Sequence, residues 1–342
     1  MVFCATVGAV WALYLAYVFG SWLLSDHFAP TDPGPDPLPD HSFWFIRLFE
    51  AWMCILAVWM IWETWVKPLR RDGEPGTDGI LCTAWVTLWM HDIFLNWTVH
   101  VFTYNAHAVN FGNWTQQVPG WVSPRSNLVP EPIMAMGLTY FGLTTLACWG
   151  CIRVMELTKA RWPSVSNFKL VLVGLGMGMF LDWAGEHTFV AFGLMAYLST
   201  VPSLTLFAGE LYQFPLYEAF FFGGVIGFTG VFAYFKDDKG HTWAERGIDK
   251  LEVARVKPVK TFVRWLAMVG VFQTVARFGY TMPMQLFCIN GAAYPDDVPS
   301  YFMNGICGPG TPAACASPEV PMPRPDSYAV PPEGAPVAAT PR

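Results

Sequence analysis

Long apolar runs, separated by short polar connections, make up most of the chain. A run of about 20 apolar residues is long enough for a helix to cross a bilayer. The first run, Val2 to Leu24, has no basic residue before it and no small-residue cleavage motif after it, so we predict a spanning helix rather than a cleaved signal peptide. The same pattern predicts six further spans, at Phe43–Val66, Ile80–Thr103, Ile133–Glu156, Phe168–Val190, Pro215–Phe235 and Thr261–Pro283.

Basic residues gather in three of the connections, at Lys67–Gly79, Leu157–Asn167 and Lys236–Lys260. Loops rich in Lys and Arg stay on the cytoplasmic side of a membrane, which places these three inside. Ser25–Ser42 has no Lys or Arg and Tyr104–Pro132 has one, so we expect both to face outward. Seven spans, with the N-terminus inside and the C-terminus outside, satisfy every connection.

The apolar stretch Ala191–Phe214 contains Pro202 and is the alternative eighth span. An eighth crossing would invert one of the basic connections, so we predict a re-entrant or interfacial element on the outer side. The predicted fold is therefore all-α, a polytopic transmembrane helix bundle over residues 1–285 with an outward loop at 104–132. Residues 286–342, rich in Pro and Ala, predict a largely irregular extracytoplasmic tail.

Composition supports this class, because 54% of the residues are hydrophobic and only 13% are charged. The net charge of −6 leaves no basic patch for nucleic acid. We expect a multi-pass protein of the plasma membrane, with the lipid bilayer as a partner. Among Cys288, Cys307 and Cys315, in the outward tail, we expect one disulfide.

Several ionisable and amide residues fall inside the predicted spans, where a carboxylate costs about 2.5–3.5 kcal/mol on insertion scales. Such residues mark a functional site by default. Spacings of four residues place them on shared helix faces. The third span carries Asp92, Asn96 and His100 on one stripe with His91 beside it, and the fifth carries Asp182 and Glu186.

Packing offers a simpler explanation for each of these groups. Asp92 and His91 are consistent with a buried hydrogen bond between helices. Asp182 or Glu186 is a candidate ion-pair partner of Arg277, which lies on the seventh span. A single arginine cannot neutralise both of these acids, so we expect at least one carboxyl group to hold a proton near neutral pH, as general acid catalysis requires.

The fifth span also carries three glycines, Gly174, Gly176 and Gly178, at spacings that let a neighbouring helix approach closely.

Histidine and carboxylate side chains also suggest a metal-dependent membrane oxidase or hydroxylase. The spacings of the common iron and zinc sites are missing, because there is no His-x-x-His, His-x-x-x-His or HExxH. We therefore predict no metal and no cofactor. A proton-coupled transporter is a second alternative, although no internal repeat is visible and the polar residues lie on one side of the membrane. The candidate metal ligands are His91, His100, His187, Asp92, Asp182 and Glu186.

One stretch resembles a known family. It comprises Met90-His91-Asp92, Asn96, Phe102–Asn105, Asn110, Gly112–Trp114, Val118–Trp121 and Pro130–Pro132. These residues resemble the AveC-type spirocyclases, membrane proteins of macrolide biosynthesis. The resemblance implies closure of a dihydroxy-ketone polyketide to a spiroketal, with loss of water from the product in some members, and hence a role in antibiotic biosynthesis. A hydrophobic polyketide or another lipid-like alcohol is the implied substrate.

Spiroketal closure needs an acid and a carboxylate that stabilises positive charge, the division of labour that glycosidases use. We assign Asp92 or Asp182 as the acid and Glu186 as the stabiliser or base, with His91 and His100 orienting them or relaying protons. Aromatic residues of the outward loop are expected to line the mouth of an outward-opening cavity, although aromatics also gather at membrane interfaces without any site. The expected substrate-binding residues are Asn96, Tyr104, Asn110, Trp114, Trp121, Glu131, Glu218 and Arg277.

Overall fold

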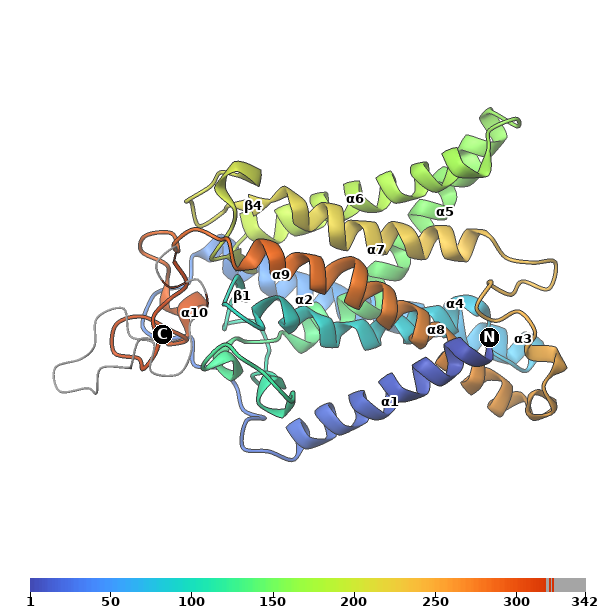
Figure 1. The fold of residues 1–342 in the computed structure, drawn as a ribbon, viewed down its shortest axis with the longest axis horizontal. Helices are drawn as coiled ribbons and strands as arrows, with labels where there is room; N and C mark the ends of the chain where they lie inside the picture. The colour runs from blue at the N-terminus through green and yellow to red at the C-terminus, as the bar shows by residue number, and fades with distance from the viewer. Residues whose placement is uncertain (318–319, 321, 323–342) are drawn as a thin grey trace, which may run out of the picture.

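The computed structural model describes residues 1–317, 320 and 322 and is mostly helical (Figure 1). The long helices are α1 (Val2–Leu23), α2 (Asp40–Ile61), α5 (Thr144–Arg161), α6 (Asn167–Ala191), α7 (Leu216–Tyr234) and α8 (Lys257–Ala276). The short helices are α3 (Lys67–Asp72), α4 (Thr77–Trp85), α9 (Met282–Cys288) and α10 (Ser300–Met303). Turns of 3₁₀ or π helix extend several of them, notably η1 (Trp62–Val66), η2 (Val86–Asn96), η5 (Ile133–Gly137), η6 (Thr139–Leu143) and η10 (Arg277–Thr281).

Helical structure lies within all of the predicted spans, and five helices are long and apolar enough to cross a membrane. These are Val2–Leu23, Asp40–Asp72, Ile133–Arg161, Asn167–Ala191 and Leu216–Tyr234, as expected of a membrane protein. The two other predicted spans correspond to α4 with η2 and to α8. Lys257, Lys260 and Arg264 make the first half of α8 polar. The number of spans and their orientation stay predictions.

The third predicted span ends earlier than Thr103, because an asparagine side chain takes over the backbone hydrogen bonding. Asn96 Oδ1 accepts from the backbone N–H groups of Val101 at 2.8 Å and Phe102 at 3.2 Å. Its amide nitrogen donates to the Phe102 carbonyl at 2.9 Å. The helix therefore stops at residue 96, and the chain turns into a strand.

Residues 191–214 contain no spanning helix. They form β2 (Met195–Tyr197), the turn η7 (Pro202–Leu204) and β3 (Thr205–Leu206), and β3 pairs with β4 (Phe214–Pro215). β2 pairs antiparallel with β1 (Phe102–Tyr104), in a register that sets Phe102 opposite Tyr197 and Tyr104 opposite Met195. This short ladder joins two segments that lie far apart in sequence, and it covers one end of the bundle (Figure 1).

The connections that carry the basic residues share the opposite end of the bundle, near the N-terminus (Figure 1). Thr77 donates to the Gly240 carbonyl at 3.0 Å, and Lys236 forms an ion pair with Asp78 at 3.0 Å. The loop at 104–132 lies at the same end as the β1–β2 ladder, together with α10. The expected disulfide joins Cys307 to Cys315. Residues 318–319, 321 and 323–342 of the predicted tail lie outside the described residues.

Glycines bring α6 and α7 into close contact. A Cβ atom on Gly227 of α7 would lie 2.6 Å from the Cα of Leu175, and one on Gly223 would lie 2.5 Å from the Cα of Met179. Gly178 of α6 contacts the backbone of both glycines. Close approach of the two backbones therefore depends on missing side chains. Gly176 differs from the expectation, because it has no neighbour within 4 Å and faces away from α7.

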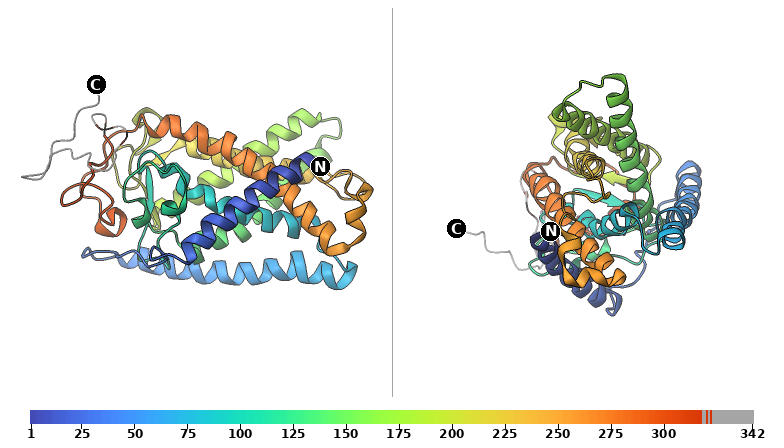
Figure 2. Two further views of the ribbon diagram at one scale, coloured as in Figure 1. Left: turned by 60° about the horizontal axis from the view of Figure 1, so that its bottom comes forward. Right: turned by 90° about the vertical axis from the view of Figure 1, so that its right-hand side faces the viewer.

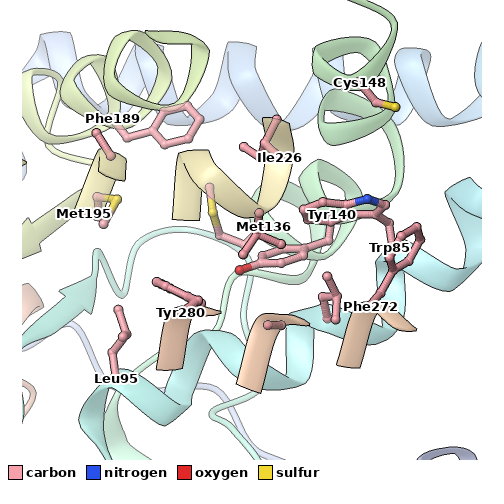
Figure 3. Packing of buried hydrophobic residues seen from close by; sticks show 14 of the residues in the cluster. Trp85, Leu95, Met136, Tyr140, Cys148, Phe189, Met195, Ile226, Phe272 and Tyr280 are labelled. Carbon is pink, nitrogen blue, oxygen red and sulfur yellow. The ribbon is translucent and has the colours of Figure 1, made fainter. Parts of the chain in front are cut away.

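Apolar and aromatic side chains fill the centre of the bundle, where the ring of Trp85 contacts those of Tyr140 and Phe272 (Figure 3). Trp85 donates to the Thr229 hydroxyl at 3.1 Å, which satisfies its only polar atom. Seen along the bundle, α2 and the α5–α6 hairpin stand at the periphery of this core (Figure 2). The core thus holds η2, η6 and α7 in fixed positions around the site described next.

Candidate functional site

A cavity of about 270 Å³ lies among η2, η6, α5, α6 and α7, next to the β1–β2 ladder. Figure 3 shows part of its apolar wall. That wall comes from Met136, Leu143, Phe189, Met195, Phe222 and Ile226. A larger cavity, of about 670 Å³, lies between α3, α4 and α8 at the other end of the bundle. None of the residues that the sequence singles out for chemistry lines that second cavity.

Three carboxyl groups reach the smaller cavity, from two different elements. Asp92 comes from η2, and Asp182 and Glu186 come from successive turns of α6. The hydroxyl of Tyr104 donates to Asp92 Oδ2 at 2.7 Å, and the hydroxyl of Tyr197 donates to Glu186 Oε2 at 2.6 Å. The predicted acids therefore converge on one space, and tyrosines orient two of them.

The strand ladder explains why both tyrosines reach these acids. Side chains two residues apart on a strand share a face, and paired residues of adjacent strands share it as well. Phe102 and Tyr104 of β1 and Met195 and Tyr197 of β2 thus lie on one face, and all four are buried. Sequence reasoning missed Tyr197, which sits in the segment predicted to re-enter the membrane. The sequence carries no signal for it, because Tyr197 reaches Glu186 only through the pairing of β2 with β1.

Within the described part of the chain, Asp182 has no polar partner for its Oδ2 atom, although the residue is only 4% exposed. Glu218 of α7 lies close enough to Glu186 and Asp182 for their charges to interact, and its Oε1 accepts from Tyr280 at 2.8 Å. The second oxygen of Glu218 is also buried and unpartnered.

No Lys or Arg lines this cavity, and the ion pairs of the described residues include none of its acids. An isolated buried carboxylate is very costly, and a buried acid commonly avoids that cost by holding its proton. Among the described residues, the cavity acids therefore lack a cation that would compensate their charge.

Tyr140, at the centre of Figure 3, is a second residue that sequence reasoning missed. It lines the cavity, is 4% exposed and lies within hydrogen-bonding reach of the Asp92 carboxyl. It sits inside a predicted span, where a tyrosine is indistinguishable from an ordinary core aromatic. The feature that distinguishes it from a phenylalanine is its hydroxyl, because a buried tyrosine O–H usually has a hydrogen-bond partner.

Glu131 lies just outside the cavity and before the helical segment that starts at Ile133. It is fully buried, and Trp89 Nε1 donates to its Oε2 at 3.1 Å while Oε1 has no partner. Burial, and secondly the charge of Asp92, raise the pKa of Glu131 well above its usual range. This residue adds a further carboxyl group that favours its neutral form.

The two histidines of the third predicted span do not join the acids. His91 Nε2 donates to Gln273 Oε1 at 2.7 Å, and Gln273 in turn donates to the Thr87 carbonyl. His100 Nε2 donates to the Pro124 carbonyl at 2.7 Å. His91 thus makes the buried hydrogen bond between helices that packing predicts, since Gln273 lies on α8, whereas Asp92 is bonded to Tyr104 of β1. Among the residues that the structure describes, no group of three His, Cys, Asp or Glu side chains is arranged so that it could hold a metal ion.

Three residues of the outward loop that were predicted to bind substrate lie away from the cavity and contact other parts of the protein. Asn110 Oδ1 accepts from the backbone N–H of Thr31 at 2.9 Å, so it anchors the loop to the segment after α1. Trp114 is fully buried against Trp22 and Phe19 of α1. Trp121 donates to two serine hydroxyls, those of Ser123 and Ser126. Of this loop, only Tyr104 lines the cavity.

Among the residues that the structure describes, Arg277 of η10 does not pair with an acid, contrary to the interpretation that it neutralises Asp182 or Glu186. Its guanidinium lies 5.2 Å from the ring centre of Phe94 and 5.1 Å from that of Trp97. An arginine over aromatic faces is stabilised by the ring quadrupoles. The acids of the cavity are thus left without this counter-charge.

The comparison with protein families gives one finding. A family model described as Spirocyclase AveC-like matches residues 76–305, more than half of the 342-residue chain. The matched range contains all three carboxyl groups of the cavity and both strands of the ladder. No curated protein and no solved structure matches the chain.

Proposed function

The chain belongs to the AveC-like spirocyclase family, and we propose that it closes a dihydroxy ketone, a polyketide or a similar lipid-like compound, to a spiroketal by carboxylic acid catalysis within the plasma membrane. One observation carries the mechanistic part of this proposal. Asp92, Asp182 and Glu186 converge on an apolar cavity whose lining contains no cation. That arrangement supplies both a protonated acid and a carboxylate.

The reaction conserves the catalytic groups. One hydroxyl of the substrate adds to the ketone and gives a hemiketal. A carboxylic acid then donates its proton to the hemiketal hydroxyl, which leaves as water and produces an oxocarbenium ion. The second hydroxyl attacks that cation, and its proton passes to the carboxylate that was left when the acid gave up its proton. The net change is the loss of one water molecule, and the acid is restored.

The proposed roles follow from the partners of each carboxyl group. Asp182 is the acid, because its Oδ2 has no partner in the protein and is available to a substrate oxygen. Glu186, held by Tyr197 at 2.6 Å, is the carboxylate that stabilises the cation. Asp92 is the alternative acid, held by Tyr104 at 2.7 Å. We assign His91 and His100 no chemical role, because each donates its Nε2 proton to another partner.

Apolar walls suit the same reaction. An oxocarbenium ion reacts readily with water, so a cavity that excludes bulk water protects it until the second hydroxyl attacks. The walls also fix the fold of a flexible chain, which decides the face of attack. Met136 of η5 and Ile226 of α7, both labelled in Figure 3, line the cavity and are candidates for this role.

The test is a single-substrate assay on the detergent-purified protein. A dihydroxy ketone is incubated with the wild-type chain, and the product is separated on a chiral column and weighed by mass spectrometry. We expect one spiroketal stereoisomer, lighter than the substrate by one water. Asp92→Asn, Asp182→Asn and Glu186→Gln are assayed in parallel. If all three variants retain the full rate and stereoselectivity, the carboxyl groups do not carry the reaction.

A further inference from the structure

The cavity is lined by residues of α5, α6 and α7, which belong to segments long and apolar enough to cross a membrane, and its routes to the outside differ in how they are covered. We infer that its substrate arrives from the bilayer through a gap between α5 and α6, and that the substrate is a long-chain amphiphile dissolved in the membrane. The inference rests on the proposed function for the chemistry, and on the cavity wall for the route.

The route through the end of the bundle that carries the β1–β2 ladder is closed. Tyr104 and Met195, the ladder residues that line the cavity, are each 3% exposed. Over the ladder packs an outer layer that contains Leu198, Tyr301 and Phe302, all buried. The Ala106 N–H donates to the Tyr301 carbonyl at 2.9 Å, which ties this layer to the segment that follows β1. A polar solute would have to displace two packed layers to reach Asp182 from this end.

The wall between α5 and α6 is thinner. Ala147 and Gly150 on α5 and Leu181 and Gly185 on α6 line the cavity and are each partly exposed. The two helices join at residues 161–167 and diverge from that hairpin towards the ladder end (Figure 1). A Cβ atom on Gly185 would have no neighbour within 4 Å, so open space lies beside this position.

The outer surface next to this wall is apolar. Phe180 and Trp183 of α6 are 55% and 37% exposed, and α6 is one of the helices able to cross a membrane. A gap in such a surface opens to lipid rather than to water. By contrast, the other face of α6 is sealed against α7 by the glycine contacts of Gly178, Gly223 and Gly227. Access from the membrane therefore runs on the α5 side of α6.

This route selects a class of substrate. A chain that enters between α5 and α6 meets Asp182 and Glu186 as soon as it passes Gly185, which lies between them on α6. The reacting ketone and hydroxyls would sit at these acids while the rest of an apolar chain remains in the gap or the bilayer. Long-chain hydroxy ketones fit this geometry, and small water-soluble ones have no route of their own.

Two glycines of α6 provide a matched pair for the test. Gly185 and Gly176 both have no neighbour within 4 Å of an added Cβ, so at either position a larger side chain starts in open space. Only Gly185 lines the cavity. Each variant is reconstituted in vesicles and treated with a long-chain alcohol that carries a photoactivatable diazirine. Labelled peptides are then identified by mass spectrometry.

We expect the wild-type chain and Gly176→Leu to be labelled at the cavity residues Met136 and Tyr140. In Gly185→Leu the labelling should fall roughly tenfold, because the added side chain overfills the gap. Equal labelling of the cavity in Gly185→Leu would overturn the route. This readout needs no turnover, so it remains decisive if the cyclisation assay fails. Turnover of a long-chain dihydroxy ketone should fall in Gly185→Leu alone. If the wild type instead is labelled at the cavity and produces no spiroketal, the proposed function fails and the route stands.

Discussion

Buried carboxyl groups occur in two settings in this molecule. Near the N-terminal end of the bundle, Glu245 is fully buried and forms an ion pair with Arg264 at 2.7 Å. On α2, Glu50 is 4% exposed and pairs with Arg47 at 2.7 Å. Asp182 is equally buried, yet it has neither a cation nor a partner for its Oδ2. The same chemical group at the same burial is thus compensated in one region and left uncompensated in the other.

We use this difference to distinguish acids that stabilise the fold from acids that are candidates for catalysis. A buried ion pair recovers much of the cost of desolvation, and breaking it leaves the remaining charge unpaired. We interpret a buried acid without a cation as a candidate functional group. In the proposed mechanism, such an acid near the cavity holds a proton that it gives to the substrate. The predictions below test this division, from the largest expected effect to the smallest.

The largest effect is expected at Asp182. Asp182→Asn keeps the shape of the side chain and removes the transferable proton, so the cyclisation rate should fall about 10²–10⁴-fold, the usual contribution of a general acid. The control is Glu50→Gln, which alters an equally buried acid that already has a cation. Initial rates, corrected for the amount of folded protein, measure both. Equal losses in the two variants would remove the distinction between the regions.

The Glu245–Arg264 ion pair should show the reverse, a loss of stability without a loss of activity. Glu245→Gln leaves Arg264 buried without its counter-charge, and the cost is about 3–5 kcal/mol of stability. Cyclisation per folded molecule should be unchanged, because this pair lies far from the cavity. Thermal unfolding in detergent measures the loss. Glu156→Gln breaks an exposed pair with Arg153 and should cost about 0–1 kcal/mol; a loss in Glu245→Gln no greater than this would mean that the buried pair is not structural.

Tyrosines that hold the acids should have an intermediate effect. Tyr104→Phe removes the donor to Asp92, and we expect a fall of about tenfold in turnover number, the effect of losing roughly 1.4 kcal/mol of transition-state stabilisation. The pH profile of the rate should also change. Tyr294→Phe is the matched control, since its hydroxyl donates to the His100 carbonyl outside the cavity. An unchanged rate and pH profile in Tyr104→Phe would show that Asp92 needs no orientation.

The smallest effect concerns Glu131, whose pKa is raised by burial and by the charge of Asp92. A carboxyl group with a raised folded-state pKa contributes its full stability below the ordinary Glu value, and loses it as the pH rises through the raised value. Wild-type stability should therefore fall over that range, and Glu131→Gln should flatten the fall. We expect a difference of roughly 2–4 °C in melting temperature, the change that about 1 kcal/mol produces in a domain somewhat smaller than this chain. Parallel pH curves for the two proteins would contradict the assignment.

Much of the cavity could be predicted from the sequence, because spacing alone places Asp182 and Glu186 on one helix face. Their convergence with Asp92 followed from the expectation that polar residues gather at one end of the bundle. The roles of Asn96 and His100 could not be predicted, since their partners are backbone atoms whose positions depend on the final fold. Tyr140 was hidden among core aromatics.

The alternative that Arg277 pairs with an acid failed for a related reason. An arginine on one predicted span and two acids on another suggest an ion pair. Phe94 and Trp97, the rings that hold it, carry no such signal in the sequence. Likewise, Tyr197 reaches Glu186 only through strand pairing between residues that lie far apart in the chain.

The central claim is that the carboxyl cluster near the cavity holds a proton at neutral pH, and infrared spectroscopy tests it most directly. The carbonyl stretch of a protonated carboxylic acid is distinct from the bands of a carboxylate. We predict this band in the wild-type protein at neutral pH, weakened in Asp182→Asn or Asp92→Asn and unchanged in Glu50→Gln. A spectrum in which neither cavity variant alters such a band would mean that the cavity acids are ionised, and would contradict the account.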